Sequence, residues 1–356
     1  MDETAAEPGS KQSYFTRLHV VGLLLTIFGV GLFSYFIYSI GMHDLVTRIE
    51  RFGFIGFGLI LGLYFFKICA RAAAWKLSVH EPYELSLRDT IPAVIIGEAM
   101  SSAIPLGILI SGTAKAVAVR KRIPLVAGLS SVATENLFYS FTTGLFLIVG
   151  AMLLLGSFAV DENLVATLYV LIGSLTFLIA FGVIMVVRQW HFASATVDWL
   201  YKKGFFKKWL EHIRFEVRRF EDLIYGFYRH YPKRFLPICL IQAGYHLLGV
   251  MEVWIILKRL TDGFPNLLNA FLLESVSRLI AILFKLVPLM IGVDEAGAQF
   301  LGRTLALAAG MGVTLAVIRK ARIIFWTMIG VLFVVKRGLS LSEITGHKET
   351  KAAEAA

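Results

Sequence analysis

The sequence predicts an all-α, polytopic membrane protein with about seven spanning helices and two broken hairpins. Hydrophobic residues make up 57% of its 356 residues and charged residues only 17%, and the mean hydropathy is +0.72. Several apolar runs reach the roughly 20 residues that a helix needs to cross a bilayer core. Two more, 91–111 and 267–292, are interrupted by Pro, Gly and charge in corresponding places of the two halves. This composition excludes a soluble domain, and paired interruptions are typical of transporters.

We expect seven spanning helices, in chain order over residues 20–41, 52–70, 124–155, 164–187, 235–257, 297–316 and 321–336. The first run lacks a small-residue cleavage pattern, so it is expected to be an anchor helix rather than a removable signal peptide. The predicted organisation is a polar tail (1–18), a transmembrane domain (19–339) with halves 52–187 and 235–339 around a basic linker (188–234), and a polar tail (340–356).

The two cysteines, Cys69 and Cys239, lie inside apolar segments, where a free thiol behaves as a small hydrophobe. They suggest neither a disulfide nor a metal site. We expect no metal and no other cofactor.

Basic residues orient the chain, because cytoplasmic loops carry an excess of Lys and Arg. The loop 112–123 has four basic residues and no acid, whereas 156–163 has only Asp161 and Glu162, so we expect the first inside and the second outside. Over 196–234, apolar and basic residues alternate at near-helical spacing, which predicts an amphipathic helix on an anionic leaflet. It would be a surface brace or, alternatively, a lipid-recruiting or regulatory element. No nucleic-acid partner is expected, since the basic face is tied to spanning helices.

The segment 91–111 either crosses the membrane or dips in and returns; we favour the dip, because Glu98, Ser101, Ser102 and Pro105 form a polar stripe. The second half repeats this pattern in the opposite sense: 267–292 dips and 297–316 returns. Each half would then contain a helix, a broken hairpin and two helices, as an inverted repeat. This arrangement leaves Lys336 and Arg337 outside. The hairpin backbone positions are Pro105, Gly107, Gly112, Pro288 and Gly292.

Charges within apolar segments are the candidate substrate pathway. Each costs about 2.5–3.5 kcal/mol at the bilayer centre, so it should face the protein interior and find a partner. Predicted pairs are Lys115 with Glu135, Glu295 with Arg319, and Glu274 with Arg278 four residues later. The alternative is that these are structural bridges which lock helix packing, and His246 and Glu252 are interpreted as separate packing residues. The candidate pathway residues are Glu98, Lys115, Glu135, Asn136, Glu274, Arg278, Glu295 and Arg319.

Three segments carry a family resemblance: GEAMSSAIPLGILISGTAKAVAV (97–119), VPLMIGVDEAGAQF (287–300) and IRKARIIFWTMIG (318–330). They resemble the transmembrane region of lysylphosphatidylglycerol synthase, the flippase-like domain of multiple peptide resistance factors, over about residues 20–340. The family's Pro, Gly and acid of the second hairpin map onto Pro288, Gly292 and Glu295, although Leu289 and Met290 stand where glycines are common. The first hairpin maps onto Pro105, Gly112 and Lys115.

The resemblance implies that the chain flips a polar lipid, such as an aminoacylated phospholipid or a lipid-linked glycan, between leaflets. We expect a stand-alone member of the family, without the aminoacyltransferase domain of bifunctional relatives. The sequence has no HExxH or GxxxxGK[ST] motif, so no enzymatic activity is expected. Expected partners are membrane lipids, a separate lipid-synthesis enzyme and possible further copies of the chain, in a bacterial inner (cell) membrane. The alternative is a non-catalytic scaffold or regulator of a lipid or cell-envelope biosynthesis enzyme.

Overall fold

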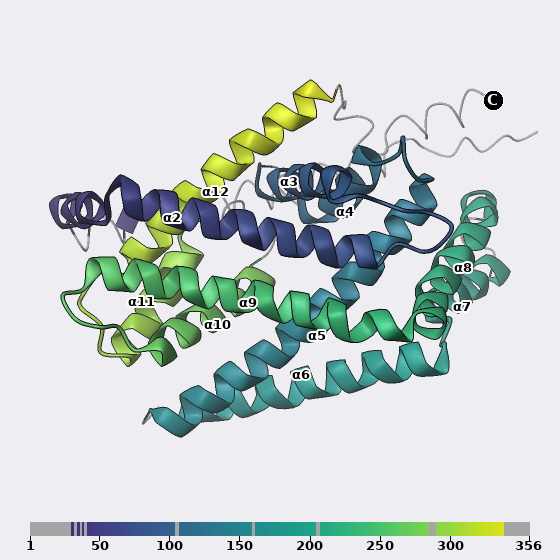
Figure 1. The fold of residues 1–356 in the computed structure, drawn as a ribbon. Helices are drawn as coiled ribbons and strands as arrows, with labels where there is room; N and C mark the ends of the chain where they lie inside the picture. The colour runs from purple at the N-terminus through teal and green to yellow at the C-terminus, as the bar shows by residue number, and fades with distance from the viewer. Residues whose placement is uncertain are drawn as a thin grey trace, which may run out of the picture.

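The computed structural model describes residues 30–31, 34–35, 38, 41–103, 107–158, 161–203, 207–284 and 290–337. Within these ranges the chain forms eleven helices and no strand, which confirms the predicted all-helical class (Figure 1). Most of the helix predicted over 20–41, the hairpin positions Pro105 and Pro288, and the tail 340–356 lie outside the described residues.

Among the described residues, four helices are long and apolar enough to cross a membrane: α2 (Met42–Leu77), α5 (Leu125–Ser157), α6 (Glu162–Arg188) and α9 (Pro232–Leu260). They correspond to the helices predicted at 52–70, 124–155, 164–187 and 235–257. Helix α2 is longer than predicted because it continues through charged residues at both ends, such as Asp44, Glu50 and Lys76, which are exposed. Gly53, at φ 66°, interrupts its helical geometry near the start.

The helix predicted over 297–316 is wrong. Helix α11 (Val293–Thr304) ends there, and α12 (Met311–Lys336) begins after a turn with Ala306 and Gly310 at positive φ. The turn brings the two helices into close contact: a Cβ on Gly312 would lie 2.2 Å from the carbonyl oxygen of Ala298. An apolar average over the segment cannot detect such a turn. The second half therefore has one long helix after its broken segment, where two were predicted.

Four shorter helices make up the broken segments: α3 (Leu87–Ala103), α4 (Gly107–Ala118), α10 (Leu267–Leu283) and α11. Each has 17 or 12 residues, fewer than the roughly 20 of a full span. Ser86 and Asp89 form the start of α3, since the amide and hydroxyl of Ser86 donate to the Asp89 carboxylate at 3.1 and 2.6 Å. Asn266 caps α10 by accepting from the amide of Leu268 at 2.9 Å.

Helices α2 and α9 lie side by side through the middle of the molecule (Figure 1). Helix α12 packs on α3 and α11, and α5 packs on α6, α9 and α10. At the far end of α12, Arg337 donates to the carbonyl of Ala118, 3.0 Å away at the end of α4. The expectation that Arg337 faces the side opposite the basic loop 112–123 is therefore wrong.

The linker forms two helices, α7 (Phe192–Lys202) and α8 (Lys207–His230), rather than one. Part of the apolar face of α8 is used inside the protein. Phe227 is 1% exposed and packs in a cluster with Phe138 of α5 and Ile238 of α9. This packing joins α8 to α5 of the first half and to α9 of the second.

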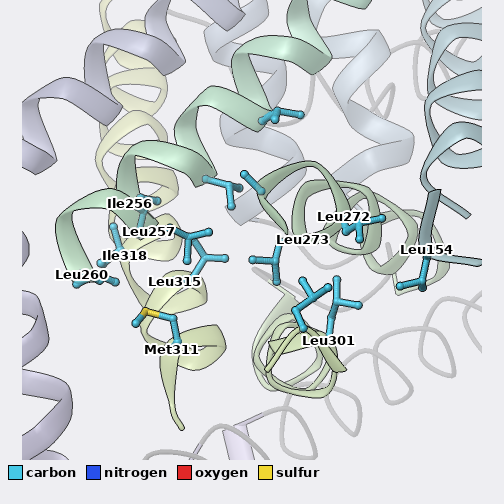
Figure 2. Close-up of a cluster of buried hydrophobic side chains, with 14 of the residues drawn as sticks. Leu154, Ile256, Leu257, Leu260, Leu272, Leu273, Leu301, Met311, Leu315 and Ile318 are labelled. Atoms are coloured by element: carbon cyan, nitrogen blue, oxygen red, sulfur yellow. The ribbon is translucent and has the colours of Figure 1, made fainter. Parts of the chain in front are cut away.

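The largest apolar core joins α5 to the second half of the chain. Figure 2 shows its leucine, isoleucine and methionine side chains at the meeting point of α9, α10, α11 and α12. Helix α6 contributes little to any core: Leu168 is its only buried residue among those described, and Val170 and Phe177 are exposed. A helix so apolar on its outer face is suited to contact with lipid chains.

Candidate functional site

A cavity of about 1530 Å³ lies between the two halves, and its walls differ in chemistry. The wall formed by α2, α3, α4, α5, α10 and α12 carries charged and hydroxyl side chains. Apolar residues of α6, such as Leu178, Ile179 and Val183, also line it. The cavity lining therefore combines charged side chains with an apolar helix.

Glu135 of α5 is the first centre of charge behind the polar wall. Its fully buried carboxylate lies 3.1 Å from Nη2 of Arg71 and 3.6 Å from Nζ of Lys115, and it accepts from the Gln242 amide at 2.8 Å. The predicted contact between Lys115 and Glu135 is confirmed. Asn136 lies beside it and accepts from Arg71 at 3.2 Å. Arg71, Lys115 and Asn136 line the cavity.

Two further buried carboxylates, Glu252 and Glu274, form the second centre. Glu274 lies 2.7 Å from Arg278 and 2.6 Å from Arg319, so the predicted pair with Arg278 is confirmed. Glu252 binds Arg322 and lies 3.5 Å from Nζ of Lys67, which is also 4.0 Å from Glu274. Because each carboxylate contacts more than one cation, α2, α9, α10 and α12 are joined in one ionic network.

The predicted pair of Glu295 with Arg319 is wrong. Glu295 instead lies 2.6 Å from Nζ of Lys320, and its other oxygen accepts from the amide of Gly292 at 2.8 Å. Successive helical residues point about 100° apart, so Lys320 reaches α11 while Arg319 reaches α10. Gly292, at φ 81°, and Glu295 thus form the start of α11, and Glu295 is not among the residues that line the cavity.

Glu98 of α3 lines the cavity and accepts from the hydroxyl of Tyr64 at 2.7 Å. The next residue back, Gly97, makes room for Lys115: a Cβ there would lie 2.7 Å from Cγ of that lysine. Gly112 also lines the cavity, and Gly107 is the first residue of α4. Gly97 therefore lets the side chain of Lys115 approach α3 closely.

The structure adds residues that sequence reasoning missed. Glu252 is no mere packing residue but a centre of the network, whereas His246 contacts Thr143 at 3.1 Å, apart from Glu252. The available signal was charge inside apolar runs, which is costly unless it faces the protein interior. Other missed members of the wall and network are Tyr64, Lys67, Arg71, Tyr245 and Arg322. Among the described residues no group of three or more His, Cys, Asp or Glu is arranged to hold a metal ion.

Comparison with known proteins gives one finding. Residues 19–331 match a family model described as the lysylphosphatidylglycerol synthase TM region. This range includes both broken segments and every residue of the ionic network. Searches of curated proteins and of solved structures give no significant match.

Proposed function

The chain belongs to the lysylphosphatidylglycerol synthase transmembrane-region family, and from this premise we propose that it flips a polar lipid between the leaflets of a membrane. The observation that carries this proposal is the cavity with two kinds of wall. A lipid has a polar headgroup, which fits the charged wall, and apolar chains, which fit the wall formed by α6. Few other substrates need both surfaces in one cavity.

The order of the helices supports an inverted repeat as the framework for this movement. In the first half α2 is followed by the pair α3–α4 and by α5; in the second, α9 is followed by α10–α11 and α12. The packing corresponds too, since α3 contacts α12 and α10 contacts α5. In our proposal the two short pairs are re-entrant hairpins that enter the membrane from opposite faces, with the cavity between them.

The ionic network provides the path for the headgroup. Glu98, Lys115 and Arg278 line the cavity, so a headgroup can exchange contacts from one to the next while the acyl chains stay beside α6. Glu135 and Glu274 hold these cations in place from behind. Alternate exposure of the cavity to each leaflet would complete the transfer.

In this proposal the protein is a non-enzymatic, multi-pass component of a bacterial inner membrane. A separate lipid-synthesis enzyme supplies the lipid, and the basic face of α8 lies on the anionic leaflet. The alternative role, a scaffold for such an enzyme, needs no cavity lined with charge.

The test is lipid scrambling in proteoliposomes, with fluorescent lipids of several headgroups. Lys115→Gln removes a cation of the cavity but leaves Glu135 its contacts with Arg71 and Gln242, so we expect a folded protein with transfer close to that of empty liposomes. Glu295→Gln is the matched control, because it changes a buried ion pair away from the cavity. We expect it to lower stability but to retain transfer per folded molecule. No transfer of any lipid by folded wild-type protein would instead favour the scaffold.

A further inference from the structure

Four side chains from four helices meet on the polar wall of the cavity: Arg71 of α2, Tyr139 of α5, Tyr245 of α9 and Arg278 of α10. The Arg71 guanidinium lies 4.5 Å from the centre of the Tyr139 ring, and that of Arg278 lies 5.0 Å from the centre of the Tyr245 ring. The two rings are 5.7 Å apart and nearly perpendicular. We call these four residues the Arg–Tyr cluster.

The hydroxyl groups of Tyr139 and Tyr245 accept hydrogen bonds within the cluster, and their own O–H groups are available to donate to a ligand. Nη1 of Arg278 donates to Tyr245 at 3.2 Å and to Tyr139 at 3.5 Å. A phenol oxygen that accepts from a guanidinium keeps its own O–H available. Within the described ranges, neither hydroxyl donates to a protein acceptor. Two O–H donors thus stand beside two guanidinium groups, which suits an anion with several oxygens, and phosphate above all.

A second observation comes from Arg322 of α12, on the same polar wall. This residue is 4% exposed and its guanidinium lies 4.0 Å from the centre of the Tyr64 ring. Its Nη1 binds Glu252, but its Nε has no hydrogen-bond partner in the described part of the protein. A buried donor without an acceptor is unfavourable, and an anion that accepts from it would remove this cost.

The charge of the cavity favours the same kind of ligand. Among the described residues, six basic side chains line it against two acidic ones, Glu98 and Asp294. Behind the wall lie Lys67 and the carboxylates of Glu135, Glu252 and Glu274. In this part of the chain, seven positive charges therefore face five negative ones, an excess of two. The six lining cations are Arg71, Lys115, Arg229, Arg278, Arg319 and Arg322.

Resting on the proposed function, we propose that the Arg–Tyr cluster binds the phosphate of an anionic lipid headgroup, and that the cavity disfavours headgroups carrying an added cationic group. The phosphate is that of a lipid rather than free phosphate because the same cavity is also lined by apolar residues of α6: Leu178, Ile179 and Val183 would offer nothing to an inorganic ion. An added ammonium would instead meet the excess of positive charge.

The test measures binding to the purified full-length chain in detergent, independently of transport. The probes are short-chain phosphatidylglycerol, phosphatidylcholine, lysylphosphatidylglycerol, glycerol phosphate and inorganic phosphate. The double variant Tyr139→Phe/Tyr245→Phe removes both hydroxyls and keeps both rings. Tyr169→Phe, the same change on the exposed face of α6, is the matched control.

We expect phosphatidylglycerol to bind at least about tenfold more tightly than the other four probes, a difference of about 1.4 kcal/mol. The double variant should lose about tenfold in affinity for it, and Tyr169→Phe should lose none. If the double variant unfolds at a lower temperature than wild type, Arg71→Lys is the second variant, since it keeps the charge and loses the planar stacking on Tyr139.

Equal binding of all the lipids, or unchanged binding by the folded variants, would overturn the proposal. Equally tight binding of glycerol phosphate or inorganic phosphate would overturn it too, because the site would then take a free anion. The result also separates the two proposals. Selective binding that depends on the hydroxyls, without scrambling, supports this site and refutes lipid flipping; scrambling with unselective binding does the reverse.

Discussion

Gly249 of α9 is the position where the ionic network is most sensitive to one added methyl group. A Cβ at this glycine would lie 2.2 Å from Oε1 and 2.8 Å from Cδ of Glu274. That carboxylate is fully buried and held at 2.7 Å by Arg278 and at 2.6 Å by Arg319. In Gly249→Ala it has to move by about 1 Å or more to regain van der Waals separation. The movement lengthens contacts with both cations.

The magnitude follows from comparison with Gly244→Ala on the same helix. A Cβ at Gly244 meets nothing within 4 Å, so this control should gain the usual 0.5–1 kcal/mol, about what Gly costs in a helix relative to Ala. The same gain applies to Gly249→Ala and cancels in the comparison. The difference in stability between the two variants is then the overpacking at Gly249, about 1–3 kcal/mol, increased by the weakened ion pairs of Glu274. At about 2.1 cal/mol/K per residue, the overpacking by itself corresponds to roughly 1–4 °C in unfolding temperature.

The assay is thermal unfolding of the two purified variants and wild type in one detergent, followed by tryptophan fluorescence. We expect the order Gly244→Ala, wild type, Gly249→Ala from highest to lowest. Glu274→Asp shortens the side chain by one methylene, so Gly249→Ala should cost less in that background. If Gly249→Ala unfolds at or above the temperature of Gly244→Ala, the carboxylate does not pack on this glycine and the reasoning fails.

Three further predictions concern the network and one loop. Glu252→Gln removes one negative charge from beside the buried cations that Glu252 contacts and should cost about 3–5 kcal/mol of stability. The measurement is a large drop in unfolding temperature or in folded yield. A variant as stable as wild type would contradict a central role of Glu252 in the ionic network. Lys320→Met leaves the buried carboxylate of Glu295 without its cation and should destabilise the protein by a similar amount. The double change Lys320→Met/Glu295→Gln should recover stability and leave headgroup preference unchanged. A double variant no more stable than Lys320→Met would refute the ion pair between Lys320 and Glu295. Burial lowers the pKa of His80, between α2 and α3, below its ordinary value of 6.5. Its stabilising contribution is therefore complete above that pH and declines as the pH falls towards and through the folded-state pKa. Unfolding temperatures at pH 7.5 and 5.5 should differ less in His80→Gln than in wild type; an equal difference would exclude this group as a cause.

The sequence by itself determined the class of the protein and most of its long helices. Helices α5, α6 and α9 were predicted within a few residues, because a run of apolar residues of spanning length is a local property. The contact of Glu274 with Arg278 was also local, four residues apart on one helix. Both broken segments were found from their Pro, Gly and charge, although the second one extends further than predicted.

Only the tertiary structure decided how the charges are shared. Glu295 binds Lys320 and Arg319 binds Glu274, a choice set by the turn before α12 and by the direction each side chain takes from that helix. Hydropathy records how apolar a segment is, but not where its chain turns. Nor does it show which distant helix stands opposite, and Arg71 reaches Glu135 across 64 positions of sequence. The charges had to be paired somewhere because an unpaired ion in the membrane is costly, and helix packing chose the partners.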